Sequence, residues 1–162
     1  MADSSFDVVS KVDHMEAANA ANQATKEIAQ RYDFRDTGAS LELSGSTFKM
    51  SANSEDRVLA VLDVLQTKLI KRGISLKSLE TGDAYPSGKE FRLEATLKEG
   101  IDQANAKKLS KLIRDEAPKS VKSQIQGDEL RVSSKSRDDL QATIQLLKGA
   151  DVELDLQFIN FR

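Results

Sequence analysis

Apolar and polar residues alternate along the first half of the chain in a pattern that predicts the element order β-α-β-β-α-β. The alternation predicts a strand over residues 5–12 and a hairpin over residues 41–50. Residues 14–34 are rich in alanine and free of glycine and proline, so they predict a helix between these strands. Apolar residues at helical spacing predict a second helix that ends at Gly73, and residues 74–80 predict the closing strand.

The second half of the chain repeats this pattern. It follows the segment 81–88, which contains Pro86 together with glycine and serine and is predicted to be a linker. The repeated pattern predicts strands over 90–97 and 154–158, a hairpin over 121–132, and helices over 101–116 and 137–148.

Residue identities repeat together with the pattern. At an offset of 82 residues, Gly45 coincides with Gly127 and Ser54 coincides with Ser136. A repeated βαββαβ unit is typical of the ferredoxin-like fold. The sequence therefore predicts an α+β protein of two tandem ferredoxin-like units, over residues 1–84 and 85–162. Each unit is expected to be a four-stranded antiparallel sheet with two helices on one face.

The overall composition is that of a folded protein with little net charge. The chain of 162 residues has a formal net charge of -2, and 39% of its residues are hydrophobic. These values exclude a disordered chain and a strongly basic protein that binds nucleic acid by bulk attraction. No apolar run approaches the ~20 residues that span a bilayer, and the N-terminus lacks the features of a signal peptide. The expected location is the cytoplasm, away from membranes.

The residue types needed for several kinds of catalysis are missing. The chain has no cysteine and only one histidine, His14. This composition excludes disulfides, thiolate nucleophiles, Ser-His nucleophile pairs and zinc sites built on several histidines. A carboxylate-dependent hydrolase is a weak alternative, because the acidic pairs along the chain are adjacent and charge-balanced. We therefore expect a protein that is not an enzyme and needs no metal or cofactor.

A basic segment provides the candidate binding site. Residues 103–137 contain nine Lys or Arg against four Asp or Glu, although the whole chain is acidic. The segment ends where Ser136 is predicted to cap a helix, and a helix start with arginine and lysine beside it suits a phosphate group. Glutamines on the preceding strand have the donors and acceptors to read base edges. A capped helix start without any ligand explains the same residues and stays an alternative. The candidate nucleotide-binding residues are Lys122, Gln124, Gln126, Arg131, Lys135, Ser136 and Arg137.

Aromatic residues are absent from the strand positions expected to face outward. RNA-recognition modules of this fold stack bases on aromatics of the open sheet face. Here Phe6, Phe48, Phe91 and Phe158 all fall on the inward register. The pattern argues against sequence-specific reading of single-stranded RNA. It leaves two hypotheses, a nucleotide-binding pocket and a protein that contacts the RNA phosphate backbone.

Several segments resemble the bacterial YajQ family over essentially the full length. They are Ser5-Phe6-Asp7, Arg31-Tyr32-Asp33-Phe34, Leu69-Ile70-Lys71-Arg72-Gly73, the stretch from Gln124 to Gln141, and Gln157-Phe158-Ile159-Asn160-Phe161-Arg162. The resemblance implies tandem ferredoxin-like domains that exchange their N-terminal strands. It also implies nucleotide or nucleic-acid binding without known enzymatic chemistry, and some family members are described as cyclic di-GMP receptors that act on transcription.

Residues and resemblance together predict a non-catalytic nucleotide-binding protein. Its ligand is expected to be a nucleotide or a cyclic dinucleotide such as cyclic di-GMP, with a regulatory role through a transcription regulator as partner. The alternative is an RNA-associated protein that contacts the phosphate backbone of tRNA or rRNA. We also expect strands 5–12 and 90–97 to be exchanged between the two units, since their inward apolar residues are so similar that each fits either sheet.

Overall fold

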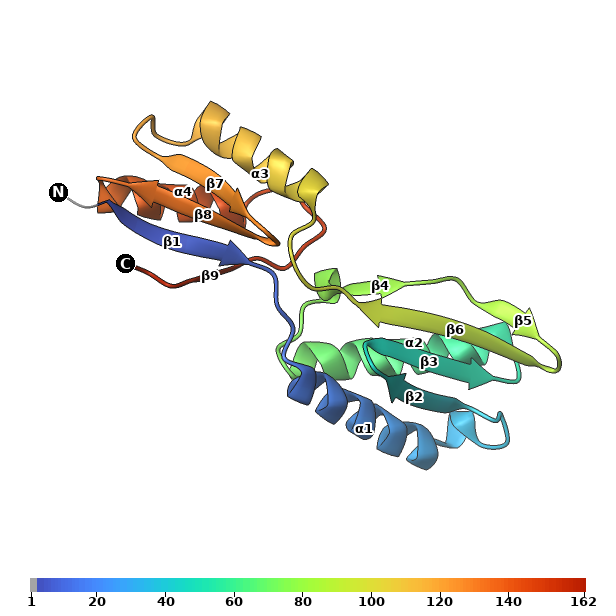
Figure 1. Ribbon diagram of the computed structural model, residues 1–162. Coiled ribbons are helices and arrows are strands. Elements are labelled where there is room, and N and C mark those ends of the chain that lie inside the picture. The colour runs from blue at the N-terminus through green and yellow to red at the C-terminus, as the bar shows by residue number, and fades with distance from the viewer. Residues whose placement is uncertain (1–2) are drawn as a thin grey trace. The chain divides into compact units, whose positions relative to one another are not determined.

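Two separate hydrophobic cores divide the chain into two units. The computed structural model describes residues 3–162. One unit comprises residues 12–98, and the other comprises residues 99–162 together with the N-terminal segment up to Lys11. Each unit is an antiparallel sheet with two helices on one face (Figure 1). The predicted α+β class with two ferredoxin-like units is confirmed.

The unit of residues 12–98 contains a five-stranded sheet. The strand order is β2-β3-β6-β4, and β5 pairs with β6 beyond β4 along the strand. The elements are α1 (His14–Gln30), β2 (Ser40–Ser44), β3 (Thr47–Ala52), α2 (Glu55–Lys71), β4 (Leu79–Thr81), β5 (Tyr85–Ser87) and β6 (Glu90–Leu97), with short 3-10 helices at Tyr32–Phe34 and Leu76–Ser78.

Helix α1 shows how the sequence produces this unit. Asp13 caps its first turn by accepting hydrogen bonds from the backbone N–H groups of Met15 and Glu16. Four alanines on one side of the helix are buried, and their small side chains allow α1 to pack closely. The helix stops where Arg31 adopts an extended backbone conformation.

The other unit contains a four-stranded sheet in the order β7-β8-β1-β9. Inward residues of β1 and β8, such as Phe6 and Val132, are paired across the strands and fully buried under the helices. The elements are β1 (Ser4–Val9), α3 (Gln103–Glu116), β7 (Lys122–Gln126), β8 (Glu129–Ser134), α4 (Arg137–Lys148) and β9 (Gln157–Ile159).

Each sheet contains one interior strand from the other sequence repeat. β1 comes from the first repeat and pairs with β8 and β9 of the second. β6 comes from the second repeat and pairs with β3 and β4 of the first. The two compact units therefore follow a different division of the chain from the two sequence repeats.

Some element boundaries differ from those that the pattern predicts. The helix predicted over 14–34 ends at Gln30 and is followed by a 3-10 turn. The strand predicted over 74–80 is replaced by a 3-10 turn and the short strand Leu79–Thr81, and the last strand is Gln157–Ile159 rather than 154–158. The segment 81–88 is not a free linker, because β5 within it pairs with β6. Among residues 3–162, no helix is long and apolar enough to cross a membrane.

Candidate functional site

The structure separates the seven predicted site residues into two groups. Lys122, Gln124, Gln126 and Arg131 lie on β7 and β8, whereas Lys135, Ser136 and Arg137 lie at the start of α4. Because Leu130 and Val132 point at the helices, Arg131 lies on the opposite, open face of the sheet. Lys122, Gln124 and Gln126 share that face, with Gln124 directly opposite Arg131. The predicted residues thus mark two surfaces of one unit.

The start of α4 has the cap that the sequence predicts. The hydroxyl of Ser136 accepts a hydrogen bond from the backbone N–H of Asp139, at 3.2 Å. The reciprocal bond of a capping box, from the backbone N–H of Ser136 to the Asp139 carboxylate, is not formed. This N–H donates to the Ser134 hydroxyl, and the Asp139 carboxylate accepts from the Ser120 hydroxyl. Ser136 therefore stabilises the helix, and its hydroxyl is already engaged without a ligand.

A pocket of about 370 Å³ opens beside Arg137, and we refer to it as the α4 pocket. Its size falls within the range of small-molecule sites, which begins at roughly 300 Å³. Its lining combines apolar and polar side chains. It is lined by Ser4, Ser5 and Phe6 of β1, by Arg137, Leu140, Gln141 and Ile144 of α4, and by Phe161 and Arg162 after β9.

A β-bulge at Asn160 shapes one wall of the α4 pocket. Asp7 is opposite Ile159 in the sheet, but the next pair of backbone hydrogen bonds joins Ser5 to Arg162, at 3.2 and 2.9 Å. The C-terminal strand therefore contains one residue more than β1 between these two pairs. Asn160 is the extra residue of this bulge. Its φ is 56°, in the left-handed region that asparagine tolerates.

The bulge brings Phe161 to the same side of the strand as Phe158. Both rings contact Phe6, with centroid distances of 6.0 Å for Phe161 and 5.9 Å for Phe158. Phe6 is fully buried, whereas Phe161 keeps 61% of its surface exposed. The exposed ring of Phe161 therefore lines the α4 pocket and packs on the buried ring of Phe6.

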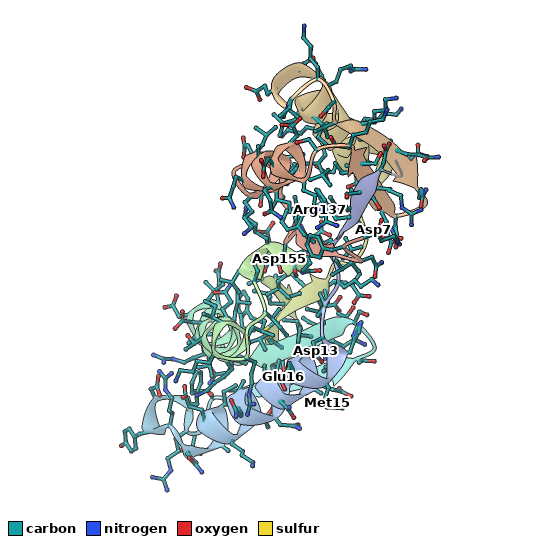
Figure 2. All side chains as sticks on the ribbon, turned by 90° about the vertical axis from the view of Figure 1, so that its left-hand side faces the viewer. Asp7, Asp13, Met15, Glu16, Arg137 and Asp155 are labelled. Carbon is teal, nitrogen blue, oxygen red and sulfur yellow. The ribbon has the colours of Figure 1, made fainter. Side chains whose placement is uncertain are left out.

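The guanidinium groups of the two arginines that line the α4 pocket are bonded to residues on opposite faces of β1. Arg137 Nε is 3.5 Å from the Ser4 hydroxyl, and Arg162 Nη1 donates to the Ser5 hydroxyl at 3.2 Å. Figure 2 shows Arg137 between α4 and β1. Arg137 has no ion pair within the part of the chain that the structure describes. The Arg137 guanidinium can therefore bind an anion with charge-assisted hydrogen bonds.

Asp7 on the open face holds Arg131 and Arg162 in place. Only 3% of Asp7 is exposed, and its carboxylate accepts hydrogen bonds from Arg131 Nε at 3.1 Å, from Asn160 Nδ2 at 2.8 Å and from Arg162 Nη2 at 3.5 Å. Burial by itself would raise the pKa of Asp7. The hydrogen bonds from Asn160 and Arg131 and the charges of the two arginines outweigh burial, so the pKa lies below its usual value.

Sequence reasoning missed most residues of the α4 pocket. Gln141, Phe161 and Arg162 were not among the predicted site residues, although all three lie in segments that resemble the YajQ family. Asp7 was not among the predicted site residues either. An acidic residue between Phe6 and Val8 was the available signal, since a charge inside an apolar strand needs partners.

The geometry suits a ligand that combines an anionic group with a ring. Its lining includes Arg137, the exposed ring of Phe161, the Gln141 amide, and the apolar side chains of Phe6, Leu140 and Ile144. Across residues 3–162, no cluster of three or more His, Cys, Asp or Glu residues could hold a metal ion.

The comparisons with known proteins agree along the whole chain. The family described as "Nucleotide-binding protein YajQ-like" matches residues 4–162. A nucleotide-binding protein of Clavibacter michiganensis subsp. michiganensis is 72% identical over 162 residues, the full length of both chains. Nucleotide-binding proteins of Streptomyces coelicolor and Rhodococcus erythropolis are 65% and 60% identical, again over the full length of both chains. The similarity therefore covers both units and the residues of the α4 pocket.

Proposed function

The chain belongs to the YajQ-like family, and on that premise we propose that it binds a nucleotide in the α4 pocket. One observation carries the proposal. Arg137 and the exposed ring of Phe161 line the same cavity. Guanidinium groups bind phosphate through paired hydrogen bonds, and an exposed aromatic ring can stack on a base.

Each part of the α4 pocket has a role in this proposal. Arg137 binds the phosphate group. Phe161 stacks on the base, and the Gln141 amide donates to and accepts from the base edge. The role is binding without catalysis, because none of the lining side chains is a carboxylate, histidine or thiol able to act as a general base.

A cyclic dinucleotide, cyclic di-GMP among them, fits the same chemistry, since it offers both a phosphodiester and bases. The proposed role is regulatory, with the liganded protein acting through a transcription regulator. Titration with mononucleotides and with cyclic di-GMP distinguishes the two ligand types, because the preferred ligand should bind at least tenfold more tightly than the other.

The Arg137→Ala variant tests the α4 pocket. It removes a charge-assisted contact of about 1.5–3 kcal/mol, so nucleotide affinity should fall by roughly tenfold or more. Isothermal titration calorimetry at one fixed salt concentration measures the change. Arg114→Ala is the matched control, because it removes the same charge from an exposed position on α3 of the same unit. Equal affinities for Arg137→Ala and the wild type would place the nucleotide elsewhere.

The open face of the same sheet supports a second candidate, contact with the RNA phosphate backbone. Lys122 and Arg131 lie on neighbouring strands of this face, together with Gln124 and Gln126. The affinity of a backbone contact depends steeply on salt. The logarithm of the binding constant falls with the logarithm of the salt concentration, with a slope of about 0.7 per phosphate contacted on a single strand. Binding of tRNA should therefore weaken strongly between low and physiological salt, and Lys122→Ala should reduce the slope. tRNA binding that is unaffected by salt would exclude this candidate.

A further inference from the structure

A second cavity, of about 620 Å³, lies in the unit of residues 12–98 and has no part in the proposed nucleotide site. We call it the loop cavity. It lies at the C-terminal end of α1, under the loop of residues 31–39 that leads into β2. Ile28, Phe34 and Leu41 form apolar parts of its wall, and Tyr32, Arg35 and Asp36 add polar groups.

The loop above this cavity is fixed by its own hydrogen bonds. The backbone N–H groups of Phe34 and Arg35 donate to the carbonyls of Arg31 and Tyr32, at 3.2 and 3.1 Å. The Thr37 hydroxyl donates to the carbonyl of Phe34 at 2.6 Å, and Phe34 itself is buried. The loop therefore presents its exposed side chains from a rigid support.

Asp36 adopts a backbone conformation that is unusual for a residue other than glycine. Its φ is 59°, in the left-handed region. Aspartate is one of the few such residues that visit this region routinely. Asp36 is one of the residues that line the loop cavity.

The two arginines of this loop have different surroundings. Arg31 is engaged, because its Nε and Nη2 atoms form a fork on the Asp33 carboxylate at 3.0 and 2.6 Å. Its guanidinium also lies 4.9 Å from the centre of the Phe34 ring. Arg35 is exposed, and within residues 3–162 it has no ion pair. Arg35 is therefore the cation that remains available at the cavity.

Tyr32 provides an exposed ring and lines the same cavity as Arg35. Tyr32 is 83% exposed. Tyrosine and arginine are the side chains that most often anchor ligands and partners, because they combine a flat apolar surface with directed hydrogen bonds.

We propose that the loop cavity binds an organic anion with a planar ring, whose charged group pairs with Arg35 and whose ring stacks on Tyr32. The apolar wall formed by Ile28 and Leu41 accommodates the edge of the ring. Asp36 opposes the charge of such a ligand and limits its affinity. Nucleotides and aromatic carboxylates both combine an anionic group with a planar ring, so the experiment uses one probe of each class.

Titration of the ¹⁵N-labelled full chain followed by NMR tests this site. The probes are adenosine monophosphate, 1-naphthoate and inorganic phosphate, which carries charge without a ring. We expect at least one ring-bearing probe to shift the amide signals of residues 31–39, and we expect inorganic phosphate to leave them unchanged. If only one ring-bearing probe shifts these signals, that probe identifies the class of ligand. If neither ring-bearing probe shifts them, the proposal is wrong.

Three substitutions make the test specific to the loop cavity. Arg35→Gln and Tyr32→Ala should each weaken binding of the effective probe about tenfold, by loss of the charge-assisted bond and of stacking, respectively. Asp36→Asn should strengthen binding several-fold, because it removes the opposing charge and asparagine keeps the left-handed backbone. Tyr85→Ala is the matched control on another part of the same unit. Unchanged affinity in Arg35→Gln would refute the role of the cavity, and Arg137→Ala, which tests the α4 pocket, should leave these shifts unchanged.

Discussion

Replacing Phe6 by alanine is expected to destabilise the unit of residues 99–162 by about 3–5 kcal/mol, the usual cost of truncating a buried phenylalanine. Phe6 is fully buried, lies opposite Val132 in the sheet, and contacts Phe158 at a centroid distance of 5.9 Å. Val132 and Phe158 both lie in the second half of the chain, far from Phe6 in the sequence. Amide hydrogen exchange should therefore accelerate in α3 and α4 and stay slow in α1 and α2.

The matched control is Leu93→Ala on β6. Leu93 is buried to the same degree and faces Met50 in the sheet of residues 12–98. This variant should lose about 2–5 kcal/mol and accelerate exchange in α1 and α2 instead. If Phe6→Ala loosened residues 12–98 and Leu93→Ala loosened residues 99–162, the strand pairing described above would be wrong.

Much of the fold follows from the sequence, because alternation and helical spacing locate the elements. The same pattern does not say which sheet a strand joins. Phe6 and Val8 have the same inward spacing as Leu93 and Ala95, so either strand satisfies either core. The choice depends on the chain connections in three dimensions, and in the sequence only the resemblance to a family addressed it.

The segment 81–88 shows how composition misleads. Proline and glycine favour a linker, but Pro86 lies in β5, which pairs only with β6. A proline is tolerated on such an edge strand, because its missing N–H is not needed by a further neighbour. The backbone N–H of Gly82 also donates to Glu94, at 2.8 Å. A strand of three residues is too short to show a periodic pattern of apolar and polar residues, so the sequence does not predict this pairing.

The candidate site was only partly accessible from the sequence for a related reason. Charge and capping locate Ser136 and Arg137, because helix starts have local signatures. The opposite wall of the α4 pocket depends on the left-handed conformation of Asn160, which moves Phe161 toward Phe6. A single bulged residue leaves no pattern in the sequence, so the aromatic ring of the pocket could not be assigned.

Asp7→Asn should lower the free energy of unfolding at pH 7 by about 1–3 kcal/mol, the usual cost of leaving buried hydrogen-bond partners unsatisfied. The Asp7 carboxylate accepts from Arg131, Asn160 and Arg162, and an asparagine offers one oxygen in place of two. Chemical denaturation followed by circular dichroism measures the loss. Asp115→Asn, at an exposed position on α3, should change stability by less than about 0.5 kcal/mol.

The difference between the wild type and Asp7→Asn should also depend on pH. The pKa of Asp7 is lowered in the folded protein, so its ionised form stabilises the fold above the unfolded pKa of about 3.9. This stabilisation is present in full at neutral pH and is lost as the pH falls below about 4 and through the lowered pKa. The two unfolding curves should therefore converge at low pH. A difference that stayed constant from pH 7 to the acid limit would mean that Asp7 acts through shape alone, without its charge on Arg131 and Arg162.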